Sequence, residues 1–441
     1  MIQAGLKLEQ APPIAVPFRF FLAAPLFLLL AALLLLWSGP DALAARLSPV
    51  AIAIAHLFAL GFMALVMMGA MMQMLPVLQG SPVPAPRFTA AASLAGVGLG
   101  TLALAAGLAF GGQALVQAGV FALAFGFLVF VAVVLVCLAR APSQSHSVRA
   151  MWIAVTSLAV AVGFGAVLAS LFGWGVSPSN PSAHSLHPGW SLLGWTGLLV
   201  VGVAYELVPM LQMTPAYPKP MVRYFGAAVF ALLVLWSAAL WAGNGRWGAF
   251  AVACAVGLAA AYALFAVATL VLQRRRRRRL PDVTLEFWRV GMASLILACV
   301  LWGARVALPV AWPESVDILI GVLAMFGFAG FVISGMLYKI MPFLAWFHLQ
   351  SLCGPGVLAP NMKKILPDAS QRLQLRSQVL ALALLCAAAL WPALFVHAAA
   401  LALGATAVLL EANMLTIVRA YRENAKQMRA RPLDKSRETG G

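Results

Sequence analysis

Residues 61–76 read GFMALVMMGAMMQMLP, a run without a charged residue in which glycine and methionine are interspersed with aliphatic side chains. A related pattern returns at residues 194–209 as GWTGLLVVGVAYELVP, and at 327–342 as GFAGFVISGMLYKIMP. The three stretches align without a gap and start 133 residues apart (194 − 61 and 327 − 194). Self-similarity at a fixed period indicates one structural unit used several times. The sequence therefore predicts three copies of a larger unit.

The composition identifies the class of protein. The chain has 441 residues, of which 63% are hydrophobic and 9% are charged, and its mean hydropathy is +0.97. Soluble domains are about one-quarter charged, so this balance excludes a soluble globular protein, a disulfide scaffold and a disordered chain. A membrane helix needs about 20 apolar residues, whereas membrane barrels give a weaker alternating signal. The long apolar runs therefore predict a multi-pass, all-α integral membrane protein.

Breaks at glycine, proline and charged residues divide the apolar runs into twelve spans. The predicted spans are 18–37, 49–79, 88–111, 113–139, 148–174, 188–214, 222–243, 246–273, 284–309, 315–346, 373–395 and 396–419. With the 133-residue period, they form three repeats of four helices, over residues 18–139, 148–273 and 284–419. We expect one transmembrane domain with pseudo-threefold symmetry, followed by a basic tail at residues 420–441.

Positive charge is concentrated in alternate connections and at both termini. The net charge is +17, from 29 Lys and Arg against 12 Asp and Glu, and residues 274–279 are six consecutive arginines. In a soluble protein this charge would indicate nucleic-acid binding. Here the positive-inside rule predicts that both termini and the basic loops are cytoplasmic, with the lipid bilayer as the partner and no nucleic acid. The arginine run is interpreted as a topology signal, with anionic-lipid binding as the alternative.

Polar residues occupy two adjacent columns of the repeat alignment. One column contains Met72, Tyr205 and Tyr338, and the next contains Gln73, Glu206 and Lys339. Glu411 is a further ionisable residue, in the last span. Such residues are costly at membrane depth and usually face the interior of the bundle. Two interpretations are open: Glu206 and Lys339 neutralise each other or local partners and fix packing, or they form a proton path from the cytoplasmic side.

Small residues and prolines recur in the same alignment. The glycine columns are Gly61, Gly194 and Gly327, and Gly69, Gly202 and Gly335; the proline column is Pro76, Pro209 and Pro342. Small residues allow close helix packing in lipid. Proline removes a backbone donor, so we expect it to end or kink each helix near the cytoplasmic side. The five cysteines form no C-x-x-C pair, and no disulfide or thiol metal site is predicted.

Four of the six histidines are predicted near the outer face: His56, His184, His187 and His397. Imidazole ligates heme iron and copper, so convergence of their spans would create a ligand site. His187 precedes Pro188, which predicts a residue at the helix boundary. His184 is either a second ligand or a surface-loop residue.

Helical phase places a methionine stripe beneath His56. Steps of three and four residues from it reach Leu60, Met63, Met67, Met71 and Met74. Methionine packs adaptably, so the stripe would suit a porphyrin face or a path for Cu(I). The alternative is an ordinary soft interface between helices. Met63 and Met67 are thus weak candidate metal contacts.

The three four-helix units resemble the catalytic-subunit superfamily of the heme-copper oxidases. The stretch from His56 to Pro76 looks like the helix whose histidine ligates the low-spin heme in that superfamily, and His187-Pro188 looks like the His-Pro that opens its sixth helix and holds copper. Residues 17–24, PFRFFLAA, are similar to the opening of the NnrS family. The resemblance implies a b-type heme or copper held by His56, His187 or His184. It also implies a bacterial-type inner-membrane location and a role in nitric-oxide response or respiratory electron transfer, with a respiratory-chain or electron-donor protein as partner.

The departures from that superfamily are equally specific. Span seven has no histidine, and span ten has none before His348 at its cytoplasmic end. A binuclear oxygen-reducing centre cannot be built from these positions, so whether the chain is an enzyme stays open. Glu206, Lys339, Glu411 and the methionines motivate an alternative, a transporter or permease for a metal, heme or small solute. A cofactor-free assembly partner of a respiratory complex is the third hypothesis.

Overall fold

The computed structural model describes residues 10–142, 145–243, 245–277, 282–353, 359 and 361–430. Within these ranges, all regular secondary structure is helical, and twelve segments are long and apolar enough to cross a membrane. The protein is thus a multi-pass helical membrane protein, as the composition predicts. Lys7, Arg278, Arg279 and residues 431–441 of the predicted basic tail lie outside the described residues.

The helices follow one another in a simple order. They are α1 (Ala15–Ser38), α2 (Pro49–His56), α3 (Leu65–Gln79), α4 (Pro86–Phe110), α5 (Gln113–Ala139), α6 (His146–Trp174), α7 (Ala183–Gly189), α8 (Leu198–Gln212), α9 (Lys219–Ala242), α10 (Arg246–Arg274), α11 (Val283–Ala307), α12 (Glu314–Val322), α13 (Phe331–Gln350), α14 (Met362–Ile365), α15 (Asp368–Leu390) and α16 (Pro392–Ala430). A 3₁₀ turn, Gly39–Leu43, follows α1.

Most predicted boundaries agree with the helices to within a few residues, and the last pair differs most. The sequence placed a break between residues 395 and 396, whereas α15 ends at Leu390 and α16 begins at Pro392. A proline is favourable at the first position of a helix because the N–H it lacks would have no partner there. The chain therefore turns at Trp391, and α16 continues as a helix to Ala430.

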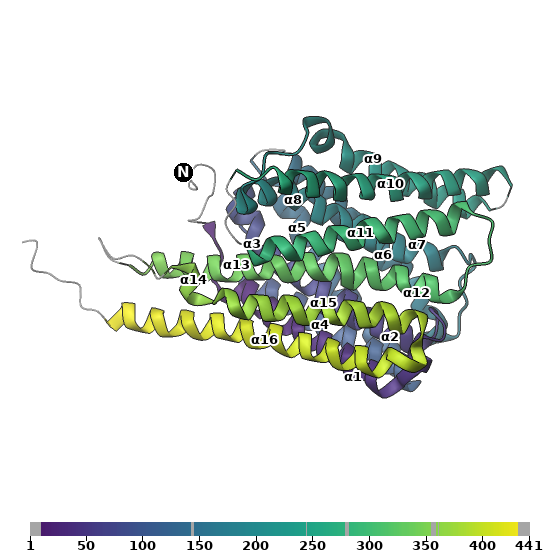
Figure 1. Ribbon diagram of the computed structural model, residues 1–441, viewed down its shortest axis with the longest axis horizontal. Helices are drawn as coiled ribbons and strands as arrows, with labels where there is room; N and C mark the ends of the chain where they lie inside the picture. The colour runs from purple at the N-terminus through teal and green to yellow at the C-terminus, as the bar shows by residue number, and fades with distance from the viewer. Residues whose placement is uncertain are drawn as a thin grey trace, which may run out of the picture.

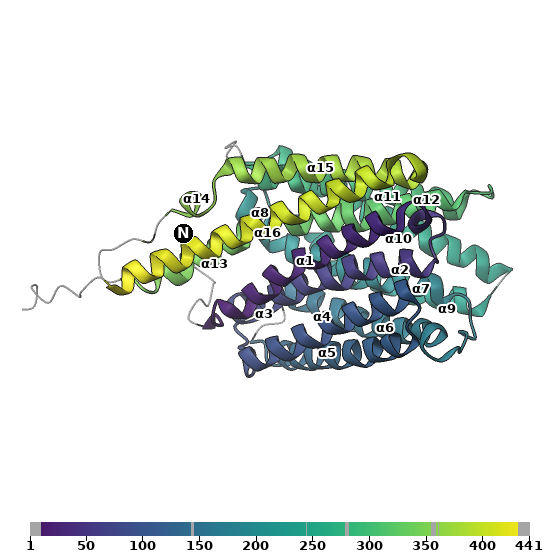
Figure 2. The same ribbon diagram turned by 90° about the horizontal axis from the view of Figure 1, so that it is seen from below.

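The spans form a closed ring around three inner ones. The outer helices α1, α6 and α11 pack against α3, α8 and α13 respectively. Neighbouring groups meet through α5 and α6, through α10 and α11, and through α16 and α1, so the last helix lies beside the first. Figures 1 and 2 show that α1 begins and α16 ends at the same end of the bundle.

Each inner span contains a π-helical segment of eight residues that the sequence did not predict. These segments are Leu57–Ala64, Trp190–Gly197 and Leu323–Gly330. They start 133 residues apart (190 − 57 and 323 − 190), the spacing of the aligned stretches. The first two both contact the third, so they bring the inner spans together. π-helical turns are rare and occur frequently at functional sites.

The aligned glycines allow close approach by side chains of the outer helices. A methyl group added at Gly61 would lie 2.3 Å from the Phe27 ring, and one at Gly327 would lie 2.8 Å from Ser294 Cβ. The prolines have a smaller effect than expected. Pro76, Pro209 and Pro342 all lie inside helices, which end only at Gln79, Gln212 and Gln350. Of the two predicted effects, these prolines do not end their helices at once, and a kink at each stays a prediction.

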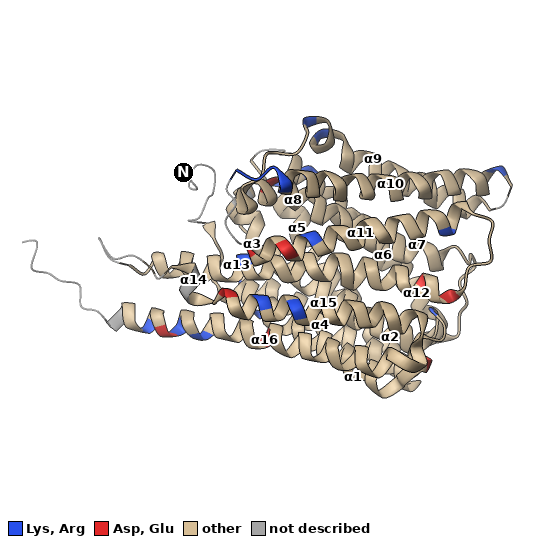
Figure 3. Ribbon diagram, viewed as in Figure 1, with Lys and Arg blue, Asp and Glu red and all other residues tan. Residues whose placement is uncertain are grey.

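Charged residues gather toward the two ends of the bundle. Figure 3 shows that the central stretches of most helices carry neither Lys and Arg nor Asp and Glu. This distribution agrees with helices whose middle portions contact lipid hydrocarbon.

Candidate functional site

The structure brings together two of the predicted ligands, His56 and His187. Their ring centroids lie 5.9 Å apart, and the ring planes differ by only 11°. His56 is the last residue of α2, immediately before the first π-helical segment, and His187 lies in α7, three residues before the second (190 − 187). The two inner spans that carry them are far apart in the chain but meet at this depth. The convergence that a shared ligand site requires is therefore present for this pair.

Backbone carbonyls fix the orientation of both rings. His56 Nδ1 lies 2.7 Å from the carbonyl oxygen of Ile52, and His187 Nδ1 lies 3.0 Å from that of Ala161 on α6. A carbonyl oxygen only accepts, so each Nδ1 carries the proton and donates it. The remaining nitrogen, Nε2, then holds a lone pair. Neither Nε2 has a hydrogen-bond partner among the described residues, which is the arrangement typical of metal-ligating histidines.

The packing around the pair is looser than in the middle of the bundle. α2 has one buried residue among eight, and α7 has three among seven. The π-helical segments that follow these two helices have six and five buried residues of eight. Both imidazole rings are themselves only partly buried.

His187 is not the boundary residue that the His-Pro pair predicted. The helix begins four residues earlier, at Ala183, and Pro188 lies inside it. His184 occupies the same short helix and is partly exposed; its amide donates to the Pro181 carbonyl, and its ring has no hydrogen bond within the described part of the chain. His397 packs elsewhere, against Gly39 at the end of α1. The four predicted outer histidines therefore do not form one cluster.

The methionine stripe does not continue beneath His56 as a straight line. Its phase was derived from a regular α-helix, but residues 57–64 are π-helical and take more residues per turn. Met63 and Met67 are 2% and 6% exposed and belong to the hydrophobic core. This burial is what an interface between helices requires, and a contact of Met63 or Met67 with a cofactor stays a prediction.

Glu206 and Lys339 have separate local partners. Glu206 accepts a hydrogen bond from the Ser147 hydroxyl at the start of α6, and Lys339 Nζ lies 2.9 Å from Asp282 Oδ2 before α11. The two residues therefore do not neutralise each other; each is held by the outer helix packed against its own. Asp282 was missed from the sequence, although an Asp just before an apolar run is a helix-capping signal.

Asp282 lies outside the membrane-spanning segments and is the N-cap of α11. Its Oδ1 accepts hydrogen bonds from the Thr284 amide at 3.0 Å and the Thr284 hydroxyl at 2.7 Å. Burial raises the pKa of the Asp282 carboxyl, but attraction to Lys339 and the hydrogen bonds from Thr284 and Lys339 outweigh burial. The net result is a lowered pKa.

The other polar candidates differ in whether they are satisfied. The Tyr205 hydroxyl donates to the Met221 carbonyl at 3.3 Å, and the Tyr338 hydroxyl accepts from Asn413 at 2.9 Å. Gln73 Oε1 and Glu411 Oε2 are enclosed and have no hydrogen-bond partner within the described ranges. Glu411 lines a groove between α1 and α16.

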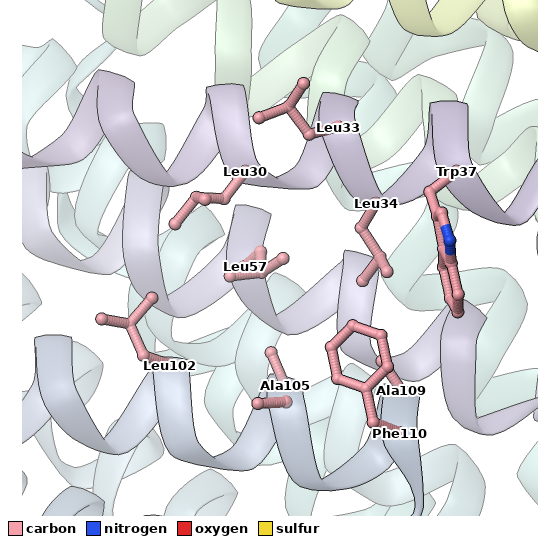
Figure 4. Close-up of a pocket in the computed structure, with 10 residues that line it drawn as sticks. Leu30, Leu33, Leu34, Trp37, Leu57, Leu102, Ala105, Ala109 and Phe110 are labelled. Atoms are coloured by element: carbon pink, nitrogen blue, oxygen red, sulfur yellow. The ribbon is translucent and has the colours of Figure 1, made fainter.

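A second groove lies between α1 and α4, and neither histidine of the pair lines it. Its volume is about 290 Å³, and Leu57, the residue after His56, forms part of its wall (Figure 4). The other labelled residues around it are leucine, alanine, Trp37 and Phe110, so its chemistry is almost entirely apolar. Trp37 and Phe110 are both 67% exposed, so the groove opens toward the lipid-facing surface.

The described residues contain no group of three or more His, Cys, Asp or Glu side chains suited to a metal ion. Any metal at the pair would take its protein ligands from the two imidazoles. Comparison of the chain with protein-family models and with curated proteins finds no match.

Proposed function

We propose that this protein binds a b-type heme between α2 and α7, with His56 and His187 as the iron ligands. The observation that carries the proposal is the pair of near-parallel imidazoles 5.9 Å apart, each oriented by a backbone carbonyl. Imidazole nitrogens bind metals at about 2 Å, which places the centroids of two rings on opposite sides of one metal about 6 Å apart. The absence of a C-x-x-C pair excludes the usual covalent heme attachment, which favours the b type.

The ligand set favours electron transfer over gas binding. A heme bound there would supply one-electron exchange, and both of its protein ligands would be imidazoles. His56 and His187 would hold it, with their Nδ1 protons donated to Ile52 and Ala161. Nitric-oxide binding would need one of these imidazoles to leave. We therefore propose respiratory electron transfer as the primary role, with nitric-oxide response as the variant that the NnrS resemblance adds.

The proposal also includes the internal repeat, the topology and the membrane of the protein. Three four-helix repeats, at about 18–139, 148–273 and 284–419, are supported by the recurrence of the π-helical segments at the 133-residue spacing. Shared placement of the start of α1 and the end of α16 agrees with both termini in the cytoplasm. With the distribution of Lys and Arg, this supports a bacterial-type inner-membrane protein resembling the heme-copper oxidase superfamily, and its NnrS branch in particular.

The transporter hypothesis receives less support. A charge path through Glu206 and Lys339 needs groups free to exchange protons or bind solute, whereas each has a local partner. Copper remains the alternative metal, because two imidazoles also suit that ion.

The absorption spectrum tests the proposal. We expect the purified protein, supplied with heme, to show a Soret band with the visible bands of a six-coordinate bis-imidazole species. His56→Ala and His187→Ala should each lose that species and at least 90% of tightly bound heme, whereas the control His397→Ala should retain both. No Soret band, or a band unchanged in both variants, would overturn the assignment. If the protein binds one copper ion per chain and no heme, the two histidines are copper ligands and the heme proposal is wrong.

A further inference from the structure

Two arginines and one aspartate meet at the end of the bundle where α2, α7 and α12 begin. Arg46 precedes α2, Arg305 lies in the last turn of α11, and Asp317 lies in the first turn of α12. Arg46 Nε lies 3.6 Å from Asp317 Oδ2, and Arg305 Nε lies 3.3 Å from Asp317 Oδ1. Figure 3 shows charged residues near the start of α12. One carboxylate therefore stands between two guanidinium groups, with one group at each oxygen.

The shared aspartate leaves most of the hydrogen-bonding capacity of both arginines unused. A guanidinium group has five N–H donors, yet no side-chain hydrogen bond joins Arg46 or Arg305 to another residue that the structure describes. Both groups approach Asp317 most closely through Nε, and their side chains are 45% and 36% exposed, so the terminal Nη atoms are open to a ligand. Glu314 accepts a hydrogen bond from the Arg46 backbone amide instead.

The π-helical segments give the level of this cluster relative to the histidine pair. The third segment contacts the other two, so the three segments mark a common depth. His56 precedes its segment by one residue, His187 by three and Asp317 by six (57 − 56, 190 − 187 and 323 − 317). At about 1.5 Å per residue, Asp317 lies about 4.5 Å beyond His187 and about 7.5 Å beyond His56, toward the end where these spans begin.

The surfaces of α2 and α12 between the cluster and the pair are incompletely covered by protein. The two inner spans meet at both levels, where the Arg46 amide reaches Glu314 and where the rings of Phe58 and Phe326 lie 5.9 Å apart. Between these contacts, α2 has one buried residue and α12 has none, although α12 packs against both α11 and α15. Because protein interiors are normally close-packed, this uncovered surface indicates room for a ligand beside the histidine pair.

We propose that Arg46 and Arg305 bind the two propionate carboxylates of the heme held by His56 and His187. The inference rests on the proposed heme site and adds the residues that recognise the charged edge of the same molecule. A carboxylate binds a guanidinium group through two parallel N–H···O bonds, and heme carries two carboxylates on one edge. Asp317, between the two guanidinium groups, holds them side by side.

Heme dimethyl ester tests the charge pairing, because it keeps the iron and the ring but has no ionised carboxylate. The purified full chain is titrated with heme and with the ester, and the Soret band gives both affinities. Arg46→Gln and Arg305→Gln should each weaken heme binding about tenfold, whereas affinity for the ester should stay within about twofold of the parent. Partitioning into detergent affects parent and variants equally, so it cancels in this comparison. Arg246→Gln, which removes an exposed arginine that stacks on Trp247, is the matched control and should bind both compounds like the parent.

The spectrum separates this inference from the proposed function. At saturating heme, all three arginine variants should keep the bis-imidazole spectrum, because both histidines are unchanged. That spectrum with unchanged heme affinity in both Arg46→Gln and Arg305→Gln would refute the inference and leave the heme site standing. Equal losses for heme and ester would show that the arginines support folding instead, and no Soret band in the parent would refute both proposals. Stabilisation of the heme-free parent by succinate, lost in Arg46→Gln, would assign the arginines to a free dicarboxylate.

Discussion

At the scale of single residues, hydrogen bonding distinguishes His56 and His187 from His348. Both nitrogens of His348 lie near backbone carbonyls, those of Leu344 at 3.0 Å and Pro12 at 3.3 Å, so this imidazole has a structural role. His56 and His187 each use only Nδ1 in this way. The other nitrogen remains available to a ligand.

The pair does not follow from the repetition of the sequence. One period of 133 residues relates His187 to Ile54, and relates His56 to Gly189. The two histidines therefore occupy different columns of the alignment, and the 133-residue spacing does not relate one to the other. The repeat therefore does not predict a second or third copy of this histidine pair, and the pair is a single site.

Gly165→Ala is expected to disturb His187 without removing it. The added methyl group would lie 3.0 Å from His187 Cε1, so the ring must shift by a few tenths of an ångström. Changes to the groups that orient a ligand typically cost 10–100-fold in metal affinity. We expect the heme affinity to fall about tenfold, with a shifted visible spectrum, in a heme titration. Gly163→Ala, which meets nothing within 4 Å, should bind like the parent; equal losses in both variants would contradict the contact.

At the scale of helices, each inner span is tied to the outer helix beside it. Gly202 lies against Ala150 of α6, and Lys339 of α13 pairs with Asp282 at the start of α11. The pair α6 and α8 also has the Ser147–Glu206 hydrogen bond, and the pair α11 and α13 also has the close contact of Gly335 with Phe287. Each pair is therefore held by both close packing and a polar contact.

Gly202→Ala should destabilise the contact between α6 and α8. The new methyl group would lie 2.4 Å from Ala150 Cβ, so the helices must separate. Overpacking of this kind costs about 1–3 kcal/mol, which thermal unfolding in detergent would detect. Gly321→Ala on the inner helix α12 meets nothing within 4 Å, and the better helix propensity of alanine should leave its stability equal or slightly higher. A Gly202→Ala variant as stable as the parent would contradict the packing.

Asp282→Asn should remove the charge but keep the helix cap, because asparagine also caps helices. The side chains of Lys339 and Asp282 are 30% and 14% exposed, so we expect a loss of about 1–3 kcal/mol at pH 7, between the values for exposed and buried pairs. Thermal unfolding of the parent and of Asp282→Asn at pH 7 measures the difference in stability. Glu286→Gln, in the exposed pair with Arg289, is the control and should cost less than about 0.5 kcal/mol.

The effect of Asp282 should depend on pH in a defined direction. The carboxyl has a lowered pKa in the folded protein, so its stabilisation is fully present above its unfolded pKa of about 3.9. It is lost as the pH falls through the lowered folded value. The parent and Asp282→Asn should therefore converge in stability when the pH is lowered from 7 toward 2. A difference that grows in acid would show that the ion pair is not its source.

At the scale of the whole molecule, the contact between α16 and α1 closes the outer ring. An even number of spans places the two ends of the described chain on the same side (Figures 1 and 2). The first and last helices therefore run antiparallel where they pack together.

Reporter fusions test which side that is. Green fluorescent protein fused after Gly441 should fluoresce, because we expect the C-terminus in the cytoplasm. Alkaline phosphatase inserted after Asn180, in the connection between α6 and α7, should be active because that connection is expected outside. The inverse pattern would reverse the orientation inferred from Lys and Arg.

Long apolar runs and their charged flanks were sufficient to predict the class of fold and the twelve spans, because lipid imposes these features on each segment separately. They could not predict the π-helical segments, which also displaced the methionine phase derived from regular geometry. The resemblance named His56, His187 and His184 as candidate ligands, because the local His-Pro pattern separates His187 from His397. Only the structure shows that His187 meets His56, whereas His397 packs on Gly39.

By itself, the sequence predicted twelve membrane-spanning helices, because each span must satisfy its own backbone hydrogen bonds in lipid, and the described residues contain twelve helices long and apolar enough to be these spans. It also determined which residues recur every 133 positions. Only the tertiary structure decided that the ring of His56 lies beside that of His187, that Lys339 pairs with Asp282 rather than Glu206, and that Glu411 Oε2 has no hydrogen-bond partner among the residues that the structure describes. These outcomes depend on the register and rotation of helices far apart in the chain, and side-chain packing between helices sets both.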